Sequence, residues 1–147
     1  MELNFENNWL QKSLENLEKD IWPPLNADEG SYLIKTCNRL RKIQLKDFEI
    51  EDLRIMINQD IGLKFLLPLA LQELEKNILV EGDYYPGDLL SAVLTSEVNF
   101  WKENPIYWKA VKKVLDNQSD RIKNEETSFE MKREWYEKME RFESIKA

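Results

Sequence analysis

The segment Leu63–Lys76 constrains the fold of this chain more than any other part of it. Drawn as a helix, its first half, LKFLLPLA, is apolar on nearly all sides, so such a helix has to run through the middle of a domain rather than across its surface. Pro68 either starts the regular part of the helix or kinks it, because a proline within a helix lacks one backbone donor and crowds the preceding turn. The segment therefore predicts a central, buried helix.

Apolar residues also recur at helical spacing before this segment. Pro23 and Pro24 must end a first helix near Ile21, whose apolar face is formed by Leu10, Leu14, Leu17 and Ile21. Ser31 can cap a second helix, in which the lysines and arginines face water and the apolar face is formed by Leu33, Ile34, Cys37 and Leu40. Cys37 is then a core residue and not a nucleophile.

A third helix is predicted from the spacing of Ile50, Leu53, Ile57 and Ile61. Its first turn is acidic, as the helix dipole favours, and Gly62 is suited to its C-terminal stop. Beyond the central helix, Pro86 is placed to be the first residue of another helix, with Asp88 in its first turn.

Two more helix starts are predicted near the C-terminus. Asn104 and Pro105 open one helix, and Ser119 is placed to cap a last, very polar helix that runs to about residue 145. The only weak strand candidate is residues 42–50, and no repeat of twenty to fifty residues is visible. An all-α, single-domain bundle of about six to eight helices over residues 1–147 is the predicted fold, in line with the length of the chain.

The residue types present exclude most catalytic chemistry. The chain has no histidine, and its four glycines do not form a phosphate-binding loop. A carboxylate pair such as Asp83 and Asp88 is the only acid–base arrangement left, and no feature indicates a sugar cleft for it. We expect no enzymatic activity, no metal and no cofactor, and a single cysteine fits a reducing compartment.

The negative charge of the chain is concentrated in its central part. Residues 47–103 contain 12 acidic and 4 basic side chains, a net charge of −8 within a total of −7, and a basic cluster precedes them (Lys35, Arg39, Arg41, Lys42 and Lys46). Such a field disfavours binding to nucleic acid and attracts a basic protein, although solubility alone is an equally good explanation of the charge.

Ordered blocks of sequence resemble one family of contact-dependent growth inhibition (CDI) immunity proteins. The blocks are SLENLEKDIW, CNRLRKIQL, DLRIMINQDIGLKFLLPLAL, EGDYYPGDLL and the pair Phe100–Trp101, which together span about residues 13–101; the polar helical segment at about residues 105–145 shows no match. The resemblance implies a protein that binds the cognate toxin C-terminal domain in the cytoplasm and neutralises it without turnover. The charge favours a nuclease toxin with a basic cleft.

The candidate toxin contacts combine carboxylates with tyrosines, which supply charge-assisted hydrogen bonds and large rigid contact area. They are Glu49, Glu51, Asp52, Asp60, Glu81, Asp83, Tyr84, Tyr85 and Asp88. For the loop at residues 82–87 helix capping and packing is the competing interpretation, and for Asp52 and Arg54 it is an intrachain hydrogen bond or salt bridge. Trp108 and Trp135 are further apolar candidates for which burial in the core competes.

Nucleic acid is not an expected partner, because the central part of the chain is strongly negative. A membrane is not expected either, because no apolar run approaches the roughly 20 residues that cross a bilayer. The N-terminus shows no secretory signal, so the cytoplasm is the expected location, and the free protein is expected to be a monomer. A different class of function remains open, in which a helical adaptor acts through self-association of its aromatic patches and polar C-terminal segment.

Overall fold

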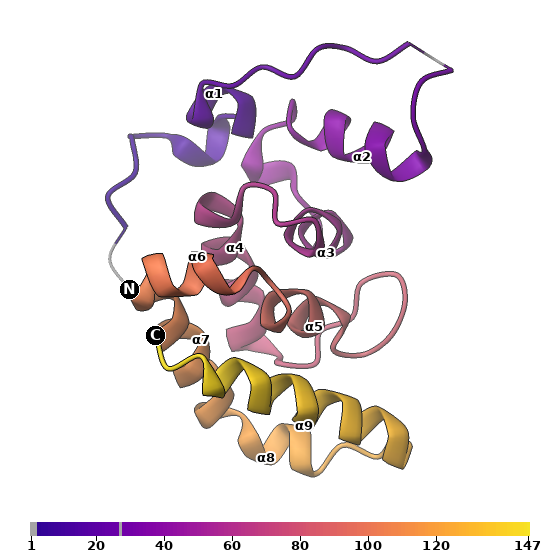
Figure 1. Cartoon of the computed structure of the whole chain (residues 1–147), viewed down its shortest axis with the longest axis vertical. Helices are drawn as coiled ribbons and strands as arrows, with labels where there is room; N and C mark the ends of the chain where they lie inside the picture. Colours follow the sequence, from indigo (N-terminus) through magenta and orange to yellow (C-terminus); the bar gives the residue numbers. More distant parts are fainter. Residues whose placement is uncertain (1–2, 27) are drawn as a thin grey trace.

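A computed structural model describes residues 3–26 and 28–147 of the chain. Within these residues the protein forms nine α-helices and two single-turn 3-10 helices, and no β-strand. In chain order they are η1 (Trp9–Gln11), α1 (Leu14–Glu18), α2 (Tyr32–Leu40), η2 (Leu45–Asp47), α3 (Ile50–Asn58), α4 (Leu63–Lys76), α5 (Asp88–Leu94), α6 (Val98–Glu103), α7 (Pro105–Asn117), α8 (Ser119–Lys123) and α9 (Phe129–Ser144). The all-α prediction is confirmed. Helices α1 and α2 lie at one end of the long axis of the molecule and α8 and α9 at the other (Figure 1).

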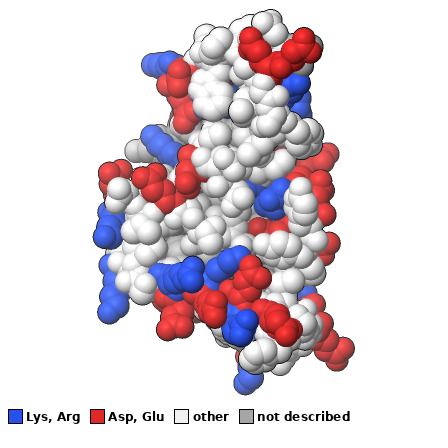
Figure 2. Space-filling view, turned by 45° about the vertical axis from the view of Figure 1, so that its right-hand side comes forward, with Lys and Arg blue, Asp and Glu red and all other residues white. Residues whose placement is uncertain are grey.

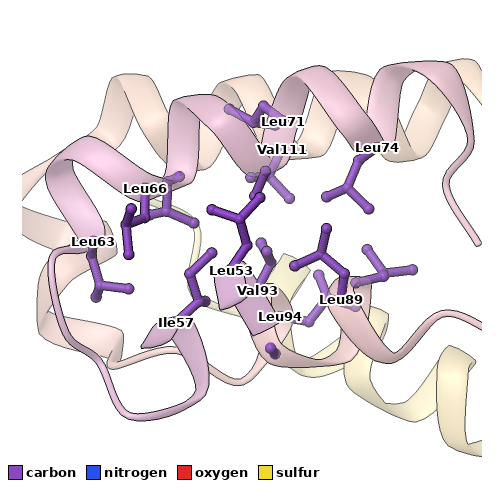
Figure 3. Close-up of a cluster of buried hydrophobic side chains, with 14 of the residues drawn as sticks. Leu53, Ile57, Leu63, Leu66, Leu71, Leu74, Leu89, Val93, Leu94 and Val111 are labelled. Carbon is purple, nitrogen blue, oxygen red and sulfur yellow. The ribbon is translucent and has the colours of Figure 1, made fainter. Parts of the chain in front are cut away.

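Helix α4 is the central helix that its apolar sequence predicts, with the predicted bounds. Its buried leucines point toward side chains of α3, α5 and α7, among them Leu53, Leu89 and Val111 (Figure 3). A continuous apolar core therefore surrounds α4 on several sides, and burial of this surface is the main favourable contribution to folding.

Pro68 lies inside α4 rather than at its start. Another residue in this position would donate its N–H to the carbonyl of Lys64, four residues earlier, and proline has no N–H to donate. The Tyr107 hydroxyl of α7 donates to that carbonyl instead, at 2.7 Å. The helix continues through the proline with this acceptor satisfied by a side chain from a neighbouring helix.

Polar side chains complete several other helix ends. The Ser31 hydroxyl accepts the N–H of Ile34 at the start of α2, as predicted. At the end of α4, the amide of Gln118 donates to the carbonyls of Leu74 (2.7 Å) and Glu75 (3.0 Å) and accepts the N–H of Ile78 (2.8 Å). One side chain thus pairs backbone groups that the helix terminus leaves unpaired.

The described residues form nine α-helices where the sequence predicts about six to eight, because α6 was not predicted and the last predicted helix is divided into two; the first predicted helix is also shorter than expected. The first predicted helix begins later than expected, because Ser13 caps α1. It ends at Glu18, because Lys19 adopts a left-handed conformation (φ 54°). Ile21 therefore lies outside the helix and is 78% exposed. At the other end of the chain, Ser119 begins the short α8, and Ser128 caps a separate α9.

Three further predictions are wrong in detail. Gly62 does not end α3; it precedes α4 (φ 65°), while Asp60 takes the left-handed conformation after α3 (φ 57°). Pro86 is not a helical residue, because it pairs with Glu81 in an isolated antiparallel bridge and α5 begins at Asp88. The strand candidate at residues 42–50 contains η2 and the start of α3.

Helix α2 departs most from its predicted surface pattern. Cys37 and Leu40 are buried as expected, whereas Leu33 and Ile34 are 39% and 52% exposed. Arg41, expected to face water, is buried at the end of the helix. Its guanidinium donates to the Glu18 carboxylate and the Asp20 carbonyl and lies over the Trp22 ring. A buried cation is tolerated here because acceptors and an aromatic face replace its water.

The polar C-terminal helix α9 packs against the rest of the domain. Trp135 and Phe142 are buried, and Phe142 lies edge-on to Trp101 with ring centroids 5.0 Å apart. The indole N–H of Trp108 donates to the Phe142 carbonyl at 2.9 Å. Trp135 is thus a core residue, and Trp108 is half-buried against the same core.

Candidate functional site

The loop at residues 81–87, between α4 and α5, is organised around the carboxylate of Asp88. This carboxylate accepts the N–H groups of Gly82 (2.6 Å), Tyr84 (3.1 Å) and Tyr85 (3.4 Å). Its side chain is 1% exposed. Asp88 therefore positions the loop from inside, and its carboxylate is not on the surface as a partner contact requires.

Helix α3 holds the loop from the other side through Glu51 and Arg54. The guanidinium donates two hydrogen bonds of 2.6 Å to the Glu51 carboxylate, which also accepts the N–H of Asp83 at 3.0 Å. Arg54 also lies 3.9 Å from the carboxylate of Asp88. The hydrogen bond from Arg54, and next the one from Asp83, lowers the pKa of Glu51, while the bond to Glu51 raises the pKa of Arg54. Both groups stay charged over a wide pH range.

Tyr84 is the most exposed aromatic side chain of the loop. The Arg54 guanidinium lies 4.5 Å from its ring centroid, and the residue is 70% exposed. The arginine thus supports one face of the ring, and the remainder faces solvent. Tyr85 is half-buried, and Glu81 and Asp83 are exposed.

Two glycines allow the loop to pack this closely. A Cβ atom on Gly82 would lie 2.7 Å from the Glu51 carboxylate, and one on Gly87 would lie 2.8 Å from the indole nitrogen of Trp135. Gly87 also has a φ of 83°, which favours glycine. The loop conformation therefore depends on close contacts with both α3 and α9.

The remaining candidates fall into two groups. Glu49 and Asp52 form a capping box at the start of α3, in which the Asp52 carboxylate accepts the N–H of Glu49 at 2.9 Å. Asp60 lies beyond the other end of α3, where its carboxylate accepts the N–H of Glu97 at 2.9 Å. The structure thus brings Glu51, Asp83, Tyr84 and Asp88 together and leaves Asp60 apart.

Arg54 belongs to this site but is not among the candidate toxin contacts predicted from the sequence. Its position three residues after Glu51 was the available signal, because residues at this spacing on a helix face each other. The competing interpretation of the sequence, an intrachain salt bridge of Arg54 and a hydrogen bond of Asp52, is what the structure contains.

Residues 3–26 and 28–147 contain neither a metal-binding cluster nor a membrane-spanning helix. There, no group of three or more Cys, Asp or Glu side chains is arranged to hold a metal ion. No helix in this part of the chain is long and apolar enough to cross a membrane.

Comparison with known proteins gives one family. The family model described as CDI immunity proteins matches residues 16–111, which extend from α1 into α7 and include the loop together with Glu51, Arg54 and Asp88. No curated protein and no solved structure matches the chain.

Proposed function

The chain belongs to the family of CDI immunity proteins, and from this premise we propose that it binds the C-terminal domain of a cognate toxin and neutralises it by stoichiometric attachment. The family match over most of the chain is the observation that carries the proposal. We expect the free protein to be a monomer and the encounter to take place in the cytoplasm, where the toxin would act.

We assign part of the interface to the α3–loop surface, which we define as the exposed residues Glu49, Glu81, Asp83 and Tyr84. Tyrosine offers rigid contact area with a polar tip, and carboxylates form strong hydrogen bonds with arginine and lysine. Arg54, Glu51 and Asp88 already hold the loop, so little conformational freedom remains to be lost on binding.

The toxin surface that meets this loop is proposed to be basic, as the substrate cleft of a nuclease is. Carboxylates from the immunity protein would then replace phosphates in the cleft, and the negative field would steer the encounter. Asp83 and Asp88 are poorly arranged for acid–base catalysis, since the Asp88 carboxylate is occupied by three loop N–H groups. This supports binding without turnover.

The test is co-purification with the C-terminal domain of the protein encoded immediately upstream, followed by measurement of the dissociation constant. Reversing the charge of Glu49, Glu81 and Asp83 to lysine should weaken binding by about 100-fold or more, because each change sets like charges against each other. The matched control reverses three exposed glutamates of the C-terminal segment to lysine: Glu126, Glu130 and Glu140.

Equal affinity of the two triple variants would remove the α3–loop surface from the proposal. A wild-type protein that binds no toxin domain and self-associates in sedimentation would instead favour the helical adaptor.

A further inference from the structure

The first turn of α2 exposes three consecutive large apolar side chains, which we call the α2 anchor: Tyr32 (80% exposed), Leu33 (39%) and Ile34 (52%). Leu33 shares a helix face with Cys37 and Leu40, both of which are buried. The apolar face of α2 therefore extends one turn further toward the N-terminus of the helix than the part that packs against the domain.

Residues 22 and 23, which precede α2 in the chain, contact the second half of this helix. Asn38 donates to the Pro23 carbonyl (3.0 Å) and Lys42 to the Trp22 carbonyl (2.8 Å), so this segment lies along the second half of the helix. Three adjacent large apolar side chains that are each at least 39% exposed form a patch of the kind that a partner covers.

The α2 anchor is linked to the α3–loop surface through helix α3. Helix α2 packs against α3, and Glu51 of α3 binds the loop. The start of α2 and the loop lie along the same side of the molecule (Figure 1). With that side turned forward, a broad area of uncharged residues covers its upper part, and acidic and basic side chains are mixed around it (Figure 2).

Charge distinguishes the α2 anchor from the loop. A hollow beside α2 is lined by Pro24, Leu25, Asn26, Lys35, Asn38, Arg39 and Lys42. Three of these side chains are basic and none is acidic, and Lys42 is paired with Glu15 at 2.7 Å, outside this set. A partner surface that fits here is apolar with carboxylates at its border. A second copy packed with α2 at the two-fold axis would set Arg39 near its own equivalent, which like-charge repulsion disfavours.

We propose that the α2 anchor is the apolar part of the toxin interface, where Tyr32, Leu33 and Ile34 enter an apolar pocket on the toxin domain bordered by carboxylates. This inference rests on the proposed function. The toxin then contacts two surfaces that differ in charge and polarity: the acidic loop, and an apolar helix turn with basic neighbours.

The test compares two double variants in binding to the C-terminal domain of the protein encoded immediately upstream, in a catalytically inactive form. Tyr32→Ser with Ile34→Ser should weaken binding by about 100-fold, because central apolar anchors dominate interface energies. The control is Ile106→Ser with Phe129→Ser, which removes two equally exposed apolar side chains (61% and 75%) elsewhere and should change the dissociation constant by less than about 3-fold. Both variants should keep the thermal midpoint of the wild type, since all four side chains are already exposed.

A second arm tests the charge. Arg39→Glu should weaken binding by about 10-fold, whereas Lys109→Glu on α7 should leave it unchanged. Wild-type affinity in the α2 double variant would overturn the inference and leave the proposed function standing. If sedimentation shows that the wild type is a dimer and the α2 double variant is a monomer, the α2 anchor mediates self-association, and the inference is overturned. A wild-type protein that binds no toxin domain would overturn the proposed function and the inference with it.

Discussion

Three polar side chains in this protein complete the hydrogen bonding of the backbone. Tyr107, Gln118 and Asp88 each reach from one element to peptide groups of another. Such groups are costly to leave unpaired once they are buried. Single polar atoms at these places should therefore matter more for stability than most exposed ion pairs do.

Tyr107→Phe tests this at the proline of α4. Removal of the hydroxyl leaves the Lys64 carbonyl without its side-chain donor, so we expect the free energy of unfolding to fall by about 1–3 kcal/mol. Urea denaturation followed by circular dichroism measures the loss. Tyr136→Phe, at a 44% exposed tyrosine, is the control and should cost close to nothing. An equal cost at both sites would contradict the assigned role.

Glu51 should make stability depend on pH in the acid range. Arg54 and the Asp83 N–H lower its pKa in the folded protein below the ordinary 4.5. The unfolded chain therefore takes up the proton first as the pH falls, and the stabilisation present above pH 4.5 is lost as the pH falls through the lower folded pKa. Urea denaturation at pH 7 and near pH 3 should show a smaller loss for Glu51→Gln than for the wild type. An identical loss in the two proteins would contradict this prediction.

At the scale of whole elements, α9 is the helix whose role the sequence leaves most open. Its sequence is polar with few apolar positions, and the family match ends at residue 111, yet Trp135 and Phe142 are core residues. Trp135 also packs against Gly87, so α9 supports the start of α5 and the loop before it. The segment outside the family match is thus part of the same folding unit.

Trp135→Ala should accordingly destabilise the protein by about 3–5 kcal/mol, the usual cost of removing a buried tryptophan. The neighbouring substitution Tyr136→Ala, on an exposed position of the same helix, is the matched control and should cost far less. Thermal unfolding of both variants measures the difference. A small effect of Trp135→Ala would show that α9 does not contribute to the core as described.

Elements could be predicted where local chemistry decides them. The apolar sequence marks the bounds of α4, and Ser31 marks the start of α2. The first helix was predicted too long because apolar spacing continues to Ile21, whereas the left-handed conformation of Lys19 ends it earlier. The site shows the same division. The sequence context indicates Asp88, but its side chain is buried in the folded protein, where Arg54 from a distant part of the chain lies 3.9 Å from its carboxylate.

At the scale of the molecule, the two proposed contact surfaces lie along one side of an elongated domain (Figure 1). The total charge is −7, and the α3–loop surface carries three of the exposed carboxylates. Long-range attraction should therefore accelerate toxin binding and be weakened by salt, while the contacts that keep the complex together are less affected.

The association rate constant should fall by about 10-fold or more between 20 mM and 500 mM salt, with a much smaller change in the dissociation rate constant. Stopped-flow mixing with the toxin domain measures the first rate. The variant with Glu49, Glu81 and Asp83 changed to lysine should have a shallower salt dependence than the control variant at Glu126, Glu130 and Glu140. Equal slopes would contradict electrostatic steering by the α3–loop surface.

The loop at residues 81–87 has its shape imposed by groups that lie beneath it, namely Glu51, Arg54 and Asp88. In the interface we propose, substitutions at its outward positions, such as Asp83 and Tyr84, should alter which toxin is recognised without a matching loss of stability. Such a loop would let an immunity protein acquire new specificity as its toxin diverges, because the residues that would change are not the residues that fix the backbone.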